Sequence, residues 1–203
     1  MKKLAIALTA ALTVAAPALA ADYVPFIKAN QIVAPTPDSP TLKEKGITHG
    51  VFYKVETTSG NQTKARVYTG DHETGNANDY WAVECQRDPM TDQTLCTMSR
   101  GDFGLVYDGN ALAGSLVALT VQADGTGIET RVGNRQFMRS TPKDGQTLPD
   151  AQAAAVIKGL LAKETVLIRY THRASRIVTL RKITPAGFEQ AANYMMWRYH
   201  HMS

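Results

Sequence analysis

The chain has 203 residues, of which 44% are hydrophobic, so it is long enough and apolar enough to form a globular domain with its own core. Its 22 Lys and Arg residues and 18 Asp and Glu residues give a formal net charge of +4. A charge this close to balance does not indicate nucleic acid as a partner, because nucleic-acid-binding proteins usually concentrate basic residues on one face.

Residues 1–20 have the pattern of a bacterial signal peptide. Lys2 and Lys3 precede a short apolar run, and Ala18 and Ala20 place small residues where cleavage requires them. The apolar run is too short to span about 30 Å of hydrocarbon, and no later stretch has about 18 uninterrupted apolar residues. We therefore expect an exported protein without a transmembrane segment, located in the periplasm, secreted, or associated with the outer membrane.

The rest of the chain divides into a proline-rich segment and a folded body. Residues 21–45 contain four prolines and show no sustained periodicity, which is typical of an extended segment. We expect residues 46–203 to form a single β-rich domain. Short β-branched and aromatic runs between turn-forming residues predict strands at 51–57, 63–68, 80–85, 94–98, 105–107, 115–122, 127–132 and 135–138. This spacing is typical of a meandering antiparallel sheet or a sandwich.

Two cysteines, Cys85 and Cys96, lie in two of these runs. The residues between them include turn formers, so we expect a hairpin whose strands the cysteines link. In an oxidising compartment, pairing is the default for two cysteines of one exported chain. A redox pair is the alternative, but such pairs normally use Cys-x-x-Cys spacing, so we predict a structural disulfide.

The C-terminal third begins with a predicted helix. Residues 151–163 are rich in alanine and place apolar residues at helical spacing, and Asp150 is the expected N-cap. Two strands, 165–171 and 176–183, follow with a short turn between them.

A second helix is predicted near the C-terminus. Thr184 is expected to cap it and Pro185 to occupy its first position, and Phe188, Ala191 and Met195 fall on one side. The predicted fold class is therefore mainly β, an antiparallel β-sandwich-like domain with two α-helices in the C-terminal third.

The residues around the cysteines carry a resemblance to a known family. The motif Trp81-x-Val83-x-Cys85 is followed by a second cysteine after a polar loop, then by an apolar helix, a strand pair and a closing segment at Gly187. This order, over about residues 80–195, resembles the invasion-associated locus B family of exported proteobacterial proteins. The resemblance implies a β-sandwich in the cell envelope and an accessory role in contact with host cells, without an established catalytic site. Family members often carry a second cysteine pair, which this chain lacks.

An exported, non-catalytic binding or accessory factor is the favoured function, and an enzyme is the alternative. No complete serine-nucleophile motif is present, and no metal-binding spacing is found among the histidines, His49, His72, His172, His200 and His201. We therefore predict no catalytic residue, no metal and no cofactor. The rival is a periplasmic hydrolase with a site assembled from distant residues, which a pocket holding a histidine and a carboxylate within hydrogen-bond reach would favour.

The most concentrated charge of the folded body lies around the turn of the last predicted hairpin. With Arg169 opposite Val178, Arg169 and Arg176 would share one face of that hairpin. Guanidinium groups bind phosphate and sulfate bidentately, so the hypothesis is an anion site formed by Arg169, His172, Arg173 and Arg176. A solvated hairpin end is the alternative. The predicted partner is an anionic envelope or host-surface component, or another envelope protein.

Overall fold

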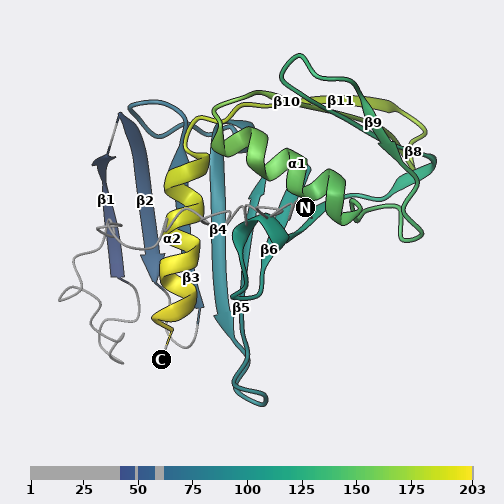
Figure 1. Cartoon of the computed structure of the whole chain (residues 1–203). Coiled ribbons are helices and arrows are strands. Elements are labelled where there is room, and N and C mark those ends of the chain that lie inside the picture. Colours follow the sequence, from purple (N-terminus) through teal and green to yellow (C-terminus); the bar gives the residue numbers. More distant parts are fainter. Residues whose placement is uncertain (1–41, 49, 58–61, 203) are drawn as a thin grey trace, which may run out of the picture.

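A computed structural model describes residues 42–48, 50–57 and 62–202 of the chain. The predicted signal peptide and most of the proline-rich segment lie outside the described residues. The elements follow one another in the order β1 (Leu42–Thr48), β2 (Val51–Thr57), β3 (Gln62–Tyr68), η2 (Ala77–Asp79), β4 (Tyr80–Arg87), β5 (Thr94–Arg100), β6 (Phe103–Tyr107), η3 (Leu112–Gly114), β7 (Leu116–Leu119), β8 (Ala123–Val132), β9 (Met138–Ser140), α1 (Asp150–Leu161), β10 (Val166–His172), β11 (Val178–Ile183) and α2 (Phe188–His200) (Figure 1).

The strands form two antiparallel sheets. Strands β1 to β7 pair in chain order as a seven-stranded meander, and the second sheet has four strands in the order β11-β10-β8-β9. The structure thus confirms a mainly β, antiparallel fold with two helices in the C-terminal third. The first described strand begins at Leu42, earlier than the predicted domain start at residue 46.

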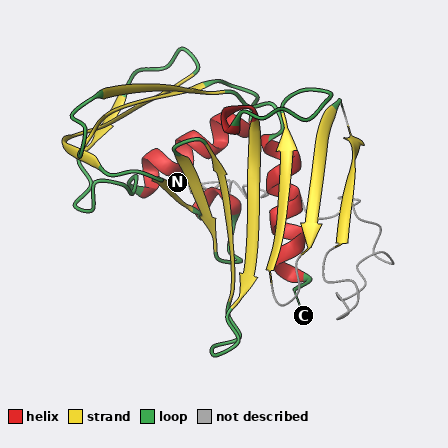
Figure 2. Cartoon of the chain, turned by 180° about the vertical axis from the view of Figure 1, so that it is seen from behind, coloured by secondary structure: helices red, strands yellow, loops and turns green. Residues whose placement is uncertain are grey.

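Each helix covers one sheet. Helix α2 lies along one face of the seven-stranded sheet, and α1 lies beneath the four-stranded sheet (Figure 1; Figure 2). Helix α2 contacts β3, β4 and β5, whereas α1 contacts β8 and β10 of the smaller sheet and also β7 and α2. Helix α1 therefore joins the two sheets into one core. Within the described part of the chain, no helix or further strand lies over the face of the smaller sheet that points away from α1 (Figure 1).

Alternation along β4 places its apolar side chains in this core. Trp81, Val83 and Cys85 are buried at every second position, as the period of a strand requires. Cys85 lies directly opposite Cys96 of β5, and the two form a disulfide with a Cα–Cα distance of 4.1 Å. The predicted disulfide hairpin is confirmed.

The predicted caps are wrong for both helices. Asp150 is the first residue of α1, and the residue before it, Pro149, makes no capping hydrogen bond through its side chain. Helix α2 begins only at Phe188, so Thr184 and Pro185 precede the helix instead of starting it.

The late start of α2 has its reason in the core. The carbonyl oxygen of Ala186 accepts a hydrogen bond from Nε1 of Trp81 at 3.1 Å, and that of Thr184 accepts one from Nη1 of Arg100 at 3.1 Å. Gly187 follows with a φ of 79°, and a Cβ at that position would lie 3.4 Å from Cδ1 of Trp81. The segment is thus held by the core, and the chain enters the helix only after it.

One predicted strand is displaced. The sequence predicts a strand at 135–138, but β9 covers Met138–Ser140. A turn precedes it, in which the backbone N–H of Arg135 donates to the carbonyl of Val132 at 3.0 Å, and Gly133 has a φ of 55°. The turn uses residues that the pattern had assigned to the strand.

Arg100 is a buried cation at the end of β5. Its Nε donates to the carbonyl of Asn78 at 2.7 Å, and its guanidinium carbon lies 5.6 Å from the centroid of the Trp81 ring. Burial lowers the pKa of Arg100, but a guanidinium remains charged in proteins. Because it also binds the Thr184 carbonyl, this single side chain connects η2, β5 and the segment before α2.

Replacing Cys85 and Cys96 together with serine is expected to lower the free energy of unfolding by about 2–3 kcal/mol, because the loop that the bond closes is short. Thermal unfolding of the double variant measures this loss. A parent protein that shows two free thiols on alkylation without reductant would contradict the assignment.

Arg100→Met is expected to lower the free energy of unfolding by about 2–4 kcal/mol, because the carbonyls of Asn78 and Thr184 lose a charged donor in a buried place. The matched control is Arg87→Met, which removes a surface ion pair with Asp92 and should cost less than about 1 kcal/mol. Chemical denaturation compares the two variants, and equal losses would show that Arg100 has no special structural role.

Candidate anion-binding surface

The four-stranded sheet has an inner and an outer face. Ile128, Thr130, Ile168 and Tyr170 are buried on the inner face. There Gln152 of α1 donates to Oγ1 of Thr130 at 2.9 Å. Because side chains alternate along a strand, the residues between these positions point away from α1.

Strand register lines up the outward residues in two rows. The first row, from β9 to β11, contains Arg139, Glu129, Arg169 and Leu180. The second row, from β8 to β11, contains Arg131, Leu167 and Lys182. We call the charged members of both rows the basic face: Arg131, Arg139, Arg169, Lys182 and the carboxylate Glu129.

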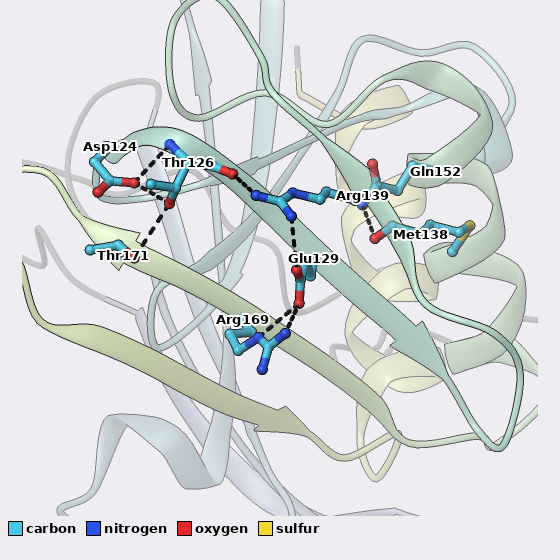
Figure 3. A network of polar contacts seen from close by, with 8 residues as sticks. All are labelled: Asp124, Thr126, Glu129, Met138, Arg139, Gln152, Arg169 and Thr171. Atoms are coloured by element: carbon cyan, nitrogen blue, oxygen red, sulfur yellow. Dashed lines mark hydrogen bonds and ion pairs between the residues drawn. The ribbon is translucent and has the colours of Figure 1, made fainter.

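Glu129 lies between two guanidinium groups (Figure 3). Its Oε2 accepts a hydrogen bond from Nε of Arg169 at 2.7 Å, and its Oε1 lies 3.7 Å from Nη1 of Arg139. Arg139 also donates to the backbone carbonyl of Thr126. One carboxylate offsets only one of the two positive charges, so this part of the surface keeps a net positive charge.

The second row borders a groove of about 830 Å³, whose lining includes Arg131, Arg135, Glu164, Leu167 and Lys182. Arg135 is paired with Glu164 at 2.9 Å. The Nε of Arg131 is buried and has no hydrogen-bond partner among the described residues, and its guanidinium carbon lies 5.0 Å from the centroid of the Phe137 ring. A guanidinium that lines a groove beside an aromatic ring suits an anionic group.

The predicted register of the last hairpin is wrong by two residues. Arg169 lies opposite Leu180, not Val178. The turn is longer than predicted because Nδ1 of His172 accepts a hydrogen bond from the backbone N–H of Ala174 at 3.2 Å. A hydrogen bond between a side chain and its own turn does not change the alternation of apolar and polar residues in the strands, so the turn length could not be predicted from that alternation.

The four predicted anion-site residues therefore take separate roles. Arg169 belongs to the basic face, whereas His172 holds the turn together. Arg176 has a φ of 58° within the turn and lies 3.6 Å from the carboxylate of Asp124. Arg173 donates to the side chain of Gln122 at 3.2 Å. The hairpin tip is thus partly neutralised, and the positive surface is centred on the sheet.

Sequence reasoning missed Arg131, Arg139 and Lys182. Arg139 was not assigned to a strand, because the short strand β9 was placed too early in the chain. Arg131 and Lys182 lay in predicted strands, but their common face depends on the pairing of both strands with β10. The signal that could have found them is the correct register of the hairpin together with strand alternation.

The edge strand β11 leaves aliphatic side chains uncovered. Val178 and Leu180 of β11 are 65% and 61% exposed, Ile177 just before the strand is 63% exposed, and Phe137 beside Arg131 is 47% exposed. Clustered apolar exposure of this kind marks interaction sites more often than isolated exposed residues do. The outward side of the smaller sheet is therefore both cationic and apolar.

A second groove, of about 660 Å³, lies at the β4–β5 hairpin and has the opposite charge. Its lining includes Asp88, Asp92, Asp108 and Tyr199. A hydrogen bond from the backbone N–H of Met90 lowers the pKa of Asp88, which keeps that carboxylate ionised. An anion would be repelled here, so the basic face is the better anion-binding surface.

Asp102 holds the smaller sheet to the larger one from the inner side. It lies in the turn between β5 and β6, and its Oδ2 accepts hydrogen bonds from Oη of Tyr170 at 2.6 Å and from Nε of Arg181 at 2.7 Å. Partial burial favours a higher pKa of Asp102, but these two hydrogen bonds outweigh it and lower the pKa. The pKa of Tyr170 is raised to about 12, mainly by burial and secondly by its hydrogen bond to Asp102.

The features that would favour a hydrolase are not brought together in the described residues. Nδ1 of His72 lies 2.6 Å from Oδ1 of Asp71, but both side chains are exposed on a loop. His49 lies outside the described residues. In the same part of the chain, no group of three or more His, Cys, Asp and Glu side chains could hold a metal ion, and no helix is long and apolar enough to cross a bilayer.

Comparison of the chain with protein-family models, curated proteins and solved structures finds no significant match. The resemblance to the invasion-associated locus B family therefore stays a prediction. The functional interpretation depends on the geometry and charge of the basic face.

The Asp102 contact predicts how stability depends on pH. Asp102 stabilises the fold above its unfolded pKa of about 3.9, and this contribution is lost as the pH falls through the lower folded value. Tyr170 contributes below its unfolded pKa of about 10, and that contribution is lost as the pH rises to about 12. Thermal unfolding over pH 2–12 should therefore show a smaller alkaline loss for Tyr170→Phe than for the parent.

Asp102→Asn tests the acidic part of this pH dependence. Its melting temperature should be lower than that of the parent at neutral pH, and the difference should shrink as the pH falls below about 4. Tyr80→Phe, which leaves the Asp102 contact intact, is the control for the alkaline arm. An unchanged alkaline slope in Tyr170→Phe would contradict the assigned role of this hydroxyl group.

Proposed function

We propose that this protein is an exported, non-catalytic binding factor of the cell envelope that recognises an anionic surface through its basic face. The observation that carries the proposal is the excess of cations on a sheet face that no described element covers. Four cationic side chains, Arg131, Arg139, Arg169 and Lys182, share this face with the single carboxylate Glu129. Arg135, in the adjacent groove, is already neutralised by Glu164.

The chemistry of these side chains suits phosphate or sulfate groups. A guanidinium offers a planar fork of donors, and an ammonium offers a compact charge, so the two types together fit a surface with several anionic groups. Arg131 lines the groove, and no carboxylate pairs with it among the described residues, so its positive charge is available to an anion there. Attraction of this kind acts over about 10 Å at moderate salt.

Two further features support a role outside the cytoplasm. The first is the Cys85–Cys96 disulfide, because such bonds persist mainly in oxidising compartments. The second is the signal-peptide pattern of residues 1–20. The resemblance to invasion-associated locus B proteins agrees with an accessory role at the envelope or at a host surface.

The parent protein should be retained on immobilised heparin, a sulfated glycan, and on vesicles that contain phosphatidylglycerol, and both interactions should weaken steeply as salt rises from about 0.05 to about 0.5 M. Replacing Arg131, Arg169 and Lys182 together with glutamine should weaken vesicle binding about a hundredfold, because three cations at about 1 kcal/mol each contribute about 3 kcal/mol, and it should also weaken retention on heparin. Affinity chromatography and vesicle co-sedimentation measure the two effects.

The matched control removes the same charge elsewhere. Lys45 and Lys64 are exposed on the seven-stranded sheet and Lys158 on α1, and their joint replacement with glutamine should leave most of the binding intact. Equal losses in the two triple variants would show a response to net charge alone. Absence of binding by the parent at low salt would rule out recognition of an anionic surface.

A further inference from the structure

We propose that the anionic surface is a phospholipid membrane, and that the smaller sheet docks on it with β11 and Phe137 entering the headgroup layer. This inference rests on the proposed function and specifies its target. It follows from the placement of apolar and cationic side chains on one face, which a purely electrostatic site does not require.

The apolar component lies within the basic face rather than apart from it. Leu180 ends the row that contains Arg169, and Lys182 lies two residues further along the same face of β11. Val178 and Leu180 are each more than half exposed, although the same sheet buries its aliphatic residues on the inner side. Exposed aliphatic side chains gain free energy when they leave water for hydrocarbon, and they gain little from a hydrated glycan.

The cationic component has room for a phosphate group. The groove of about 830 Å³ is bordered by Arg131 and Lys182 on either side of Leu167. Phe137 lies over the guanidinium of Arg131, and aromatic rings are favoured at the headgroup level of a bilayer. A lipid phosphate in this groove would thus be flanked by two cations, with apolar side chains close enough to meet its acyl chains.

Charge and apolar contact make separate demands on a membrane-docking surface. Attraction of charges alone, or apolar insertion alone, gives weak and reversible membrane association, whereas a basic patch together with an apolar element gives stable docking. The basic face supplies the charge, and Val178, Leu180 and Phe137 supply the apolar contact. The combination favours an anionic lipid surface over a sulfated glycan.

The first experiment compares Val178→Ser/Leu180→Ser with a control, Ile47→Ser/Met90→Ser, whose exposed apolar side chains lie on β1 and in the β4–β5 loop of the other sheet. Binding is measured to vesicles with phosphatidylglycerol, to pure phosphatidylcholine vesicles and to heparin. The β11 variant should lose about tenfold or more in affinity for the anionic vesicles and retain its affinity for heparin. The control should bind all three probes as the parent does.

A second measurement reports on insertion directly and does not depend on the serine variants being stable. Tryptophan fluorescence of Leu180→Trp should be quenched by anionic vesicles with brominated acyl chains, because the ring would lie among the lipids. Ile47→Trp, at a similarly exposed position on β1, should not be quenched beyond the parent.

The outcomes separate this inference from the proposed function. Unchanged vesicle binding by the β11 variant, or no added quenching in Leu180→Trp, would overturn membrane docking while leaving recognition of anionic surfaces intact. Retention on heparin without binding to anionic vesicles would do the same and would identify a glycan as the target. If the parent binds neither heparin nor anionic vesicles, the proposed function itself is overturned.

Discussion

Arg100 is enclosed between Trp81 and the backbone of two segments, η2 and the segment before α2, and this contact connects parts of the chain that are about a hundred residues apart. A cation that leaves water needs partners in the core, and here backbone carbonyls of Asn78, Thr184 and Ala186 provide them. The segment before α2 is thereby fixed against β4 and β5, which sets where α2 lies on the larger sheet. Helix α1 contacts α2 and the smaller sheet, so the position of the basic face depends on the same contact.

The two sheets are also joined by a polar contact at their boundary. Asp102, from the turn after β5, binds one residue from each of the two strands β10 and β11, namely Tyr170 and Arg181. This contact uses the inner residues of those strands, and alternation then directs Arg169, Leu180 and Lys182 outward. The features that secure the smaller sheet therefore also determine which side chains reach solvent.

Sequence patterns located most elements because burial acts locally along a strand. The alternation at 51–57 and the two cysteines were sufficient to place β2 and the β4–β5 hairpin. The start of α2 could not be predicted, because it is decided by Trp81 and Arg100, which are about a hundred residues away in the chain. The basic face was only partly predicted for the same reason: it combines residues of four strands, and its register depends on a turn that His172 shapes through its own side chain.

The two charged grooves lie far apart in the molecule. The acidic groove is at the β4–β5 hairpin, and the basic face is on the smaller sheet, which lies at the other end of the structure in Figure 1. Separated charges of opposite sign give a protein an electric dipole moment, so a field exerts a torque on it. Near a negatively charged surface this torque would rotate the molecule until the smaller sheet leads. A larger share of collisions would then be productive, and dilute solutions would show this effect most strongly because little salt screens the field.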